Sequence, residues 1–327
     1  MPRRLVNLAL LASVAVLLGT GVSGWLAPVG LTQPLDVAHQ VAGVALVLGL
    51  AAKYGIARRS LRRRGLAAAG VLLGVATAVA VALTAGLGLA WTVGAVSFDR
   101  PFPYSAMSLH VIAGLALGLL VVAHALVRGE RRPPLGSLMT RRAALRGLAL
   151  FGGSLVLATL LDAVGLPRRF TGSRHAGSFS GDQLPVTIWA FDTVPQIDIG
   201  SWRLRVSGRV ERPGEITYAE LLSFSRHEVS AVLDCTGGWW SEQRWSGVRL
   251  GDVVGSRAAL QSATAIEVIS VTGHRWSFDR GEAERALLAT HIGGEPISTG
   301  HGYPVRLVPS GHRGFTWIKW IDEIRVV

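Results

Sequence analysis

The chain has 327 residues, a formal net charge of +12 and a single cysteine. One cysteine excludes an intrachain disulfide framework and any zinc site built from several thiolates. The charge is uneven, because residues 1–166 carry 15 Lys and Arg against 4 Asp and Glu, whereas residues 167–327 carry 18 against 17. The length suggests about two domains. Since the basic residues of the first half separate long apolar runs, they indicate a membrane protein rather than a nucleic-acid binder.

Five apolar stretches are long enough to cross a hydrocarbon core about 30 Å thick, which takes about 20 helical residues. They cover approximately residues 5–27, 35–57, 66–93, 106–127 and 143–165. The arginine-rich segments 58–64 and 128–146 follow the second and fourth stretches, whereas the other two loops contain one arginine, Arg100. The positive-inside rule therefore predicts a multi-pass cell-membrane protein with a cytoplasmic N-terminus and an extracytoplasmic C-terminal half.

The segment before the fifth stretch, "TRRAALRGLALFGG" (140–153), has two interpretations. Paired arginines before a moderately apolar, glycine-rich helix resemble a twin-arginine export signal, which carries folded and often cofactor-loaded proteins. The same arginines also fit an ordinary basic flank on the cytoplasmic side of a membrane helix. The sequence leaves both interpretations open.

Three histidines lie within the apolar stretches, where ionisable side chains are costly and indicate function. His39 and His110 are each about the fifth residue of a stretch, and these two stretches run in the same direction. Two imidazoles at one depth on facing helices are the arrangement that ligates a b-type haem from both sides. In "HQVAG" and "HVIAG" a glycine one turn later leaves room for a flat macrocycle. The sequence therefore predicts one b haem near the outer surface.

The third histidine, His124, follows His110 by 14 residues, on nearly the same helix face and about 21 Å deeper. This spacing resembles the diheme cytochrome b pattern. Fourteen residues after His39, however, the second stretch has Lys53. The lysine argues against a second haem held by two histidines. The alternative for all three histidines is structural, as polar groups packed inside the helix bundle.

From about residue 167 the composition is that of a soluble domain. Alternating or compact apolar runs predict strands, and two amphipathic segments predict short helices. The expected strands are 202–210, 264–273, 302–310 and 321–327, and the expected helices are 217–224 and 281–292. The predicted fold class is thus an all-α five-span bundle over residues 1–166, followed by an α+β, mostly β domain over residues 167–327.

The second half resembles the molybdopterin-binding domain of the sulfite oxidase family over roughly residues 170–327. The resemblance lies in "HGYPVRLVP" and "IKW" near the end of the chain, in the strand and helix of 206–224, and in "VLDCTGGWW" (232–240). It implies that Cys235 is the catalytic thiolate ligand of molybdenum. The family's pterin and phosphate contacts fall on His301, Arg306, Trp317, Ile318 and Lys319.

The residues after Cys235 depart from the family. Sulfite-oxidising members place a basic run after the metal-binding cysteine, whereas this chain has "TGGWWSEQRW" (236–245). Sulfite is therefore not the expected substrate. The resemblance implies oxygen-atom transfer to or from a small molecule, with the methionine-sulfoxide-repairing relatives as a model for the reductive direction. The substrate, the direction, the nucleotide form of the pterin and the oligomeric state stay open.

The combined expectation is a membrane-bound molybdenum oxidoreductase whose electrons pass through the haem, held by His39 and His110, to membrane quinone or a redox protein. Membrane lipid and a small-molecule substrate are the other expected partners, and nucleic acid is not one. Two other classes compete with the enzyme. The outer domain could be a cofactor-free binding module on a membrane anchor, or the chain could be a haem-only electron conduit.

Overall fold

The computed structural model describes residues 3–64, 69–97, 105–128, 140–188 and 192–327. The chain forms two compact units. One comprises the chain up to Gly24 together with Leu31–Gly172, and the other comprises Trp25–Gly30 and Ser173–Val327.

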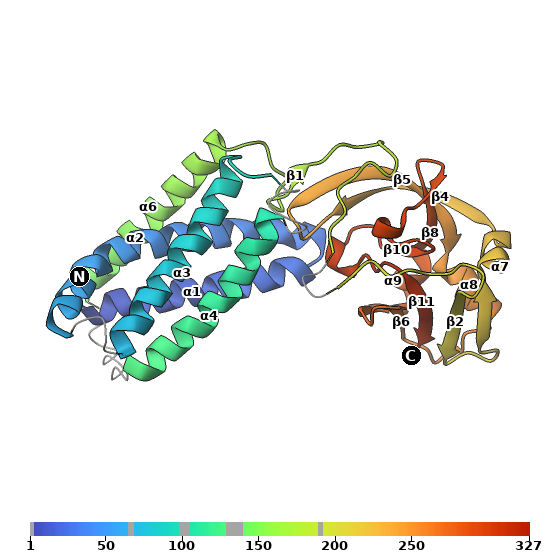
Figure 1. The fold of residues 1–327 in the computed structure, drawn as a ribbon, viewed down its shortest axis with the longest axis horizontal. Coiled ribbons are helices and arrows are strands. Elements are labelled where there is room, and N and C mark those ends of the chain that lie inside the picture. The colour runs from blue at the N-terminus through green and yellow to red at the C-terminus, as the bar shows by residue number, and fades with distance from the viewer. Residues whose placement is uncertain (1–2, 65–68, 98–104, 129–139, 189–191) are drawn as a thin grey trace. The chain divides into compact units, whose positions relative to one another are not determined.

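The first unit contains five long helices in its described residues (Figure 1). They are α1 (Arg3–Leu26), α2 (Thr32–Arg64), α3 (Ala69–Thr92), α4 (Ala106–Arg128) and α6 (Arg141–Val164). All five are long and apolar enough to cross a membrane by length and composition, which confirms the five predicted stretches. Helix α2 continues through the arginine-rich segment 58–64, because arginine is a good helix former and its side chain needs no burial.

The interior of this unit is apolar where the first four helices meet. Val14 of α1, Leu46 of α2, Val81 of α3 and Leu117 of α4 are all buried in one cluster. The last helix, α6, has a defined start, because the Thr140 hydroxyl accepts the backbone N–H of Ala143 at 3.2 Å. Such an N-cap satisfies one of the unpaired donors of the first helical turn.

The second unit consists of two mixed sheets and short helices. In the described residues one sheet has the order β1-β5-β8-β10, with β4 beside β5 and β9 beside β8, and the other has the order β3-β2-β11-β6-β7. The first sheet contains β1 (Arg174–His175), β4 (Arg226–Asp234), β5 (Trp239–Arg249), β8 (Leu287–Ile292), β9 (Glu295–Pro296) and β10 (Arg306–Val308). The second contains β2 (Arg203–Gly208), β3 (Gly214–Thr217), β6 (Ala265–Ser270), β7 (Arg275–Asp279) and β11 (Ile321–Val326).

Three short helices, α7 (Tyr218–Ser223), α8 (Leu250–Ser256) and α9 (Arg280–Arg285), complete the domain. The predicted helix 281–292 is wrong in its second half, which forms strand β8. The run "LLATHI" is paired on both sides, by β5 and β10, and is almost wholly buried. A buried strand of this kind lacks alternation, so periodicity alone does not separate it from a helix.

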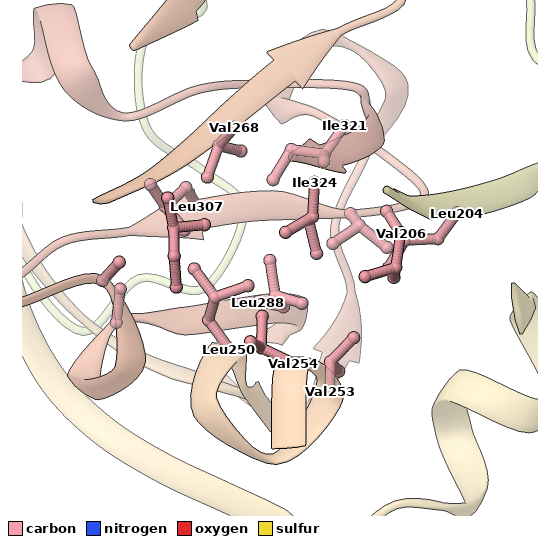
Figure 2. Close-up of a cluster of buried hydrophobic side chains, with 14 of the residues drawn as sticks. Leu204, Val206, Leu250, Val253, Val254, Val268, Leu288, Leu307, Ile321 and Ile324 are labelled. Atoms are coloured by element: carbon pink, nitrogen blue, oxygen red, sulfur yellow. The ribbon is translucent and has the colours of Figure 1, made fainter. Parts of the chain in front are cut away.

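The domain core lies between the two sheets and α8 (Figure 2). Leu204, Val206, Val268, Ile321 and Ile324 reach it from the second sheet. From the first sheet and α8 come Leu288, Leu307, Leu250, Val253 and Val254. Full burial of each Leu, Ile or Val contributes about 1.5–3 kcal/mol, so this core holds the two sheets in a fixed relation. The structure confirms the expected fold class, five long apolar helices and a mostly β domain with short helices.

Candidate functional site

The lone cysteine lies in the tight turn that joins β4 to β5. The backbone N–H of Cys235 donates to the Trp239 carbonyl at 2.8 Å, and its carbonyl accepts the Gly238 N–H at 3.0 Å. Gly238 has φ +91°, a conformation that glycine adopts without steric cost. The Gly237 N–H points at the Cys235 Sγ, 3.3 Å away. The motif "CTGG" is therefore the sequence that this turn requires.

The surroundings of the thiol act on its pKa in opposite directions. Burial raises the pKa of Cys235, whereas hydrogen bonds from Gly237 and Thr187 and the positive charges of Lys319 and Arg313 lower it. Burial dominates in the protein alone, so the sulfur is held as a thiol. Two cations and two donors nevertheless converge on it, which suits a thiolate once a bound cation offsets the desolvation.

Arg306, at the start of β10, is fully buried beside this turn. Its Nη1 donates to the His301 carbonyl at 2.9 Å, and its guanidinium lies 5.0 Å from the ring centroid of Trp245 and 5.5 Å from that of Trp317. Among the described residues its Nε has no hydrogen-bond partner. Burial lowers the pKa of Arg306 to about 10. A buried guanidinium with an unused donor is a site for an anion.

Lys319 is the second buried cation of the site. Its Nζ donates to the carbonyl oxygens of Gly300 and Thr187 at 2.7 and 3.0 Å. Burial, followed by the positive charge of Arg306, lowers the pKa of Lys319 to about 7. Gly302 lets the two cations approach each other, because a Cβ at this position would lie 3.0 Å from the Arg306 Cβ and 3.2 Å from the Lys319 Cβ.

His301 is buried in the short 3-10 turn Thr299–His301. Its Nδ1 bonds the Asp182 carboxylate at 2.7 Å, and its Nε2 bonds the Leu184 carbonyl at 3.1 Å. Burial lowers the pKa of this imidazole, and Asp182 opposes the shift. Because both ring nitrogens are engaged, His301 fastens the segment around residue 184 to the site. Its expected contact with a pterin stays a prediction.

The sequence analysis did not identify Asp182 and Thr187, in segment 179–192, as residues of the site. The Thr187 hydroxyl accepts the Trp239 Nε1–H at 2.8 Å, and the Thr187 carbonyl accepts the Lys319 Nζ. Asp182 and Thr187 both lie in "FSGDQLPVTIWAFD" (179–192). No local pattern marks either residue, because their partners, His301 and Lys319, lie more than a hundred residues further along the chain.

Arg313 was also missed as a site residue. It is buried, and its Nη2 lies 3.2 Å from Oδ1 of Asp234, which is fully buried and also accepts the Ser173 hydroxyl at 2.7 Å. A Cβ on Gly314 would lie 2.9 Å from the Cys235 Cα. The segment 311–314 therefore packs directly against the cysteine turn and is not a plain surface turn.

Trp317 and Ile318 are buried, and both of their backbone N–H groups and the Ile318 carbonyl are hydrogen bonded within the protein. The Ile318 carbonyl accepts the Leu307 N–H at 2.8 Å, and the Trp317 N–H donates to the Gly314 carbonyl at 3.2 Å. These bonds attach the final loop to β10. The expected main-chain contacts of the two residues with the cofactor stay predictions.

The helical unit brings His39 and His110 together. Their ring centroids are 6.0 Å apart, with an interplanar angle of 67°. The His110 Nδ1 donates to the Thr84 carbonyl at 2.8 Å, and the His39 Nδ1 lies 3.0 Å from the Thr20 hydroxyl. That hydroxyl donates to the Val16 carbonyl at 2.7 Å, so it accepts from His39. Hydrogen bonds at Nδ1 fix the orientation of both rings. The expected ligation of a haem by these two histidines stays a prediction.

Comparison with known proteins places the site in a class. Residues 191–327 match the family model described as the oxidoreductase molybdopterin binding domain. The protein-methionine-sulfoxide reductase catalytic subunit of Xanthomonas campestris is 35% identical over 149 residues, which are 40% of this chain and 46% of the relative. The mitochondrial sulfite oxidase of Rattus norvegicus is 28% identical over 168 residues, covering 41% and 30% of the two chains.

A plant relative and a solved structure add to these matches. The NAD(P)H nitrate reductase of Hordeum vulgare is 29% identical over 168 residues, covering 41% of this chain and 19% of the relative. The sulfane dehydrogenase SoxCD of Paracoccus pantotrophus has 23% identity and a TM-score of 0.39, covering 41% of this chain and 40% of that chain.

The match to the family model and the similarity to the reductase and sulfite oxidase relatives confirm a sulfite oxidase-like molybdopterin-binding domain in the C-terminal half. The chain is thus similar to a class of molybdopterin-dependent oxidoreductases, of which the methionine-sulfoxide reductase and sulfite oxidase are named examples. It spans less than half the length of either relative. The five-helix unit lies outside the residues matched by the family model.

The residues around Cys235 fit a molybdopterin cofactor. The described residues contain no cluster of three or more His, Cys, Asp or Glu side chains that could hold a metal ion. Within the part of the chain that the structure describes, Cys235 is thus a single thiol ligand, which suits a metal carried by a non-protein group such as molybdopterin. Arg306 and Lys319 are both buried and lie close enough to Cys235 to interact with it electrostatically, and their charges suit the anionic parts of such a group.

Proposed function

We propose that the chain is a membrane-bound molybdenum-cofactor oxidoreductase that transfers an oxygen atom to or from a small molecule. The observation that carries this proposal is the setting of Cys235, a lone buried thiol among Lys319, Arg313 and Arg306 within the matched domain. When bound, the cofactor supplies the two-electron oxygen-atom chemistry, and the protein supplies position and charge.

In this proposal each side chain of the site has a distinct role. Cys235 is the protein ligand of the metal, with Gly237 and Thr187 directing hydrogen bonds at the sulfur. Arg306 and Lys319 neutralise the anionic part of the pterin, and His301 holds the 182–187 segment against it. Because an anion favours the protonated amine, cofactor binding raises the pKa of Lys319 above its value in the protein alone.

Aromatic side chains that follow Cys235 in the sequence indicate the charge of the substrate. Trp239 is buried with its indole N–H on Thr187, and the Trp240 ring centroid lies 4.5 Å from that of His175. These rings stand where sulfite-oxidising proteins have basic residues. The setting favours a neutral substrate over sulfite. A sulfoxide fits this setting and agrees with the name of the Xanthomonas relative, a methionine-sulfoxide reductase, so methionine-sulfoxide reduction is the first reaction for a substrate screen.

The electron route of the proposal runs through one b-type haem on His39 and His110. Two imidazole nitrogens about 2 Å from a shared metal place the ring centroids roughly 6 Å apart. The observed centroid separation of 6.0 Å supports this ligation. Electrons then exchange with membrane quinone or a redox protein. The arginine distribution supports a cytoplasmic N-terminus and an extracytoplasmic catalytic domain.

Metal analysis separates the enzyme from its two competitors, the binding module and the haem-only conduit. The full chain is purified in detergent from cells that make molybdopterin, beside its Cys235→Ser variant, and molybdenum and the reduced-minus-oxidised spectrum are measured. The proposal expects about one molybdenum and a b-type band in the parent, and loss of molybdenum or activity with retained haem in the variant. A parent with haem but no molybdenum contradicts the enzyme, and one with neither supports the binding module.

A further inference from the structure

The 165–172 segment, which follows α6, lies at the end of the helical unit where α2 begins and α3 ends. The Leu166 N–H donates to the carbonyl of Thr92, the last residue of α3, at 3.2 Å. At the other end of the segment, a Cβ on Gly172 would lie 3.1 Å from Oδ1 of Asp36, near the start of α2. The segment therefore contacts both helices at this end of the unit.

This end of the unit is about one helical turn from the two histidines of the proposed haem site. In α2, His39 follows Asp36 by three residues, and in α3, Gly88 precedes Thr92 by four residues. At 1.5 Å per residue these offsets are about 4.5 Å and about 6 Å. Gly88 lies against the second histidine, since a Cβ there would be 3.1 Å from the His110 Cε1. The 165–172 segment is thus within a short distance of both imidazoles.

Arg168 of this segment is a buried cation whose side chain is only 7% exposed. Its Nη1 donates to the Thr92 hydroxyl at 3.3 Å, and its Nη2 forms an ion pair with Asp162, near the end of α6. The Thr92 hydroxyl also donates to the Gly88 carbonyl at 3.0 Å. Hydrogen bonds therefore connect Arg168 to the turn of α3 that lies against His110.

The guanidinium of Arg168 has a donor that these contacts do not use. Its Nε is buried and has no hydrogen-bond partner among the described residues. The carboxylate of Asp162 is 59% exposed, so water solvates it and it does not require the arginine. Guanidinium donors form a rigid fork that matches a carboxylate, and a buried donor without an acceptor costs free energy. The arrangement favours a further anionic acceptor beside Arg168.

We propose that Arg168 binds a propionate carboxylate of the haem placed between His39 and His110. The inference rests on the proposed haem site. A b haem is apolar except for its two carboxylates, which are costly to bury without a positive partner. Neither histidine has a Lys or Arg within two turns along its own helix, so the partner must come from another segment. The 165–172 segment supplies a buried guanidinium about one turn away.

The test compares haem with its dimethyl ester, in which both carboxylates are masked. The full chain is prepared without haem in lipid nanodiscs, and each porphyrin is titrated by its absorbance into the parent and into Arg168→Met. The variant should bind haem about tenfold or more weakly than the parent, because it loses a charge-assisted hydrogen bond to a buried carboxylate. Its affinity for the ester should stay within about threefold of the parent's, since the ester has no charge to lose.

Two further variants separate the carboxylate contact from general effects of charge. Arg168→Lys keeps the charge without the fork and should bind haem more tightly than Arg168→Met. Arg169→Met is the matched control, because it removes the same charge from the neighbouring residue, whose guanidinium lies 5.1 Å from the Phe170 ring centroid. This control should bind both porphyrins like the parent.

The unfolding temperature is recorded for every variant, and the outcomes are distinct. Equal losses of affinity for haem and for the ester in Arg168→Met overturn the inference, because the arginine would then only hold its segment against α3. Unchanged haem affinity in that variant also overturns it. A parent that binds neither porphyrin, or a His110→Ala variant that binds haem as tightly as the parent, refutes the haem site itself and the role of Arg168 with it.

Discussion

The protonation state of one residue, Lys319, changes the net charge of the site. The ammonium is buried, bonded to two backbone carbonyls and placed near Arg306, so the pKa of Lys319 falls to about 7. In the unfolded chain a lysine titrates near pH 10.4. In the cofactor-free protein the charged form of Lys319 is therefore disfavoured, and a bound anion would stabilise it.

Stability of the cofactor-free protein should consequently rise with pH from about 7 to about 8.5. In this window the unfolded chain binds a proton at Lys319 that the folded chain has partly released, so raising the pH favours the folded state by up to about 1 kcal/mol per pH unit. Above about pH 8.5 the raised pKa of Cys235 offsets this rise, because the unfolded thiol ionises before the folded one, and the stability should level off. Thermal unfolding across pH, with protein from cells that lack molybdopterin, tests this prediction.

Lys319→Met is the matched variant for that experiment. It removes the titrating amine, so it should flatten the rise between pH 7 and 8.5 and let the effect of Cys235 appear as a fall in stability at higher pH. The same slope in parent and variant would assign the dependence to other groups. In the molybdenum-loaded parent the rise should also be smaller, since the bound anion keeps Lys319 protonated.

Gly302 allows the backbone around Arg306 and Lys319 to pack closely. It has φ +116°, and a Cβ there would meet the Cβ atoms of both Arg306 and Lys319. Gly302→Ala should therefore destabilise the protein by about 1–3 kcal/mol and lower its molybdenum content. Gly311→Ala is the control, because Gly311 also has positive φ, at +89°, but no atom lies within 4 Å of its added Cβ. Urea unfolding and metal analysis should separate the two variants, and an equal loss in both would refute the steric argument.

At the scale of elements, the end of the β4–β5 hairpin is held by a buried ion pair. Asp234, the last residue of β4, joins Arg313 of the final loop and the Ser173 hydroxyl, and it directly precedes Cys235. The position of the thiol thus depends on contacts among three segments that are far apart in sequence.

Asp234→Ala should cost about 3–5 kcal/mol, because it leaves the Arg313 guanidinium buried without its carboxylate. The double variant Asp234→Ala/Arg313→Met removes the stranded charge, so its loss should be smaller than the sum of the two single losses by about 1 kcal/mol or more. Denaturant unfolding of the four proteins completes this cycle. Strict additivity would show that the pair does not couple the hairpin to the loop.

At the scale of the whole molecule, the two proposed cofactors belong to separate compact units, each with its own core. His110→Ala should therefore abolish the b-type haem band while molybdenum stays near one per chain. Cys235→Ser should lose molybdenum and keep the b-type haem band. Reduced-minus-oxidised spectra and metal analysis on the same two preparations measure both contents. Loss of molybdenum in His110→Ala would show that the units depend on each other for assembly.

Much of the architecture is readable from local patterns. Each long helix depends on a run of apolar residues that must satisfy its backbone internally, so its position follows from composition. Strand β2 alternates in burial over most of its length, and the bounds of both β2 and β11 were expected within two residues. The strand β8 was mistaken for a helix because burial on both faces removes the alternation on which the distinction depends.

The sequence by itself determined the two-part organisation, the lone thiol at Cys235 and the pair of histidines at matching depth, because these depend on composition, spacing and a recognisable motif. Only the tertiary structure decided which side chains surround the thiol. Asp182, Thr187, Asp234 and Arg313 carry no local signal, since their partners lie 52 to 119 residues away along the chain and are brought close by sheet pairing and loop packing. Contacts of that range follow from the folded core and not from any short pattern.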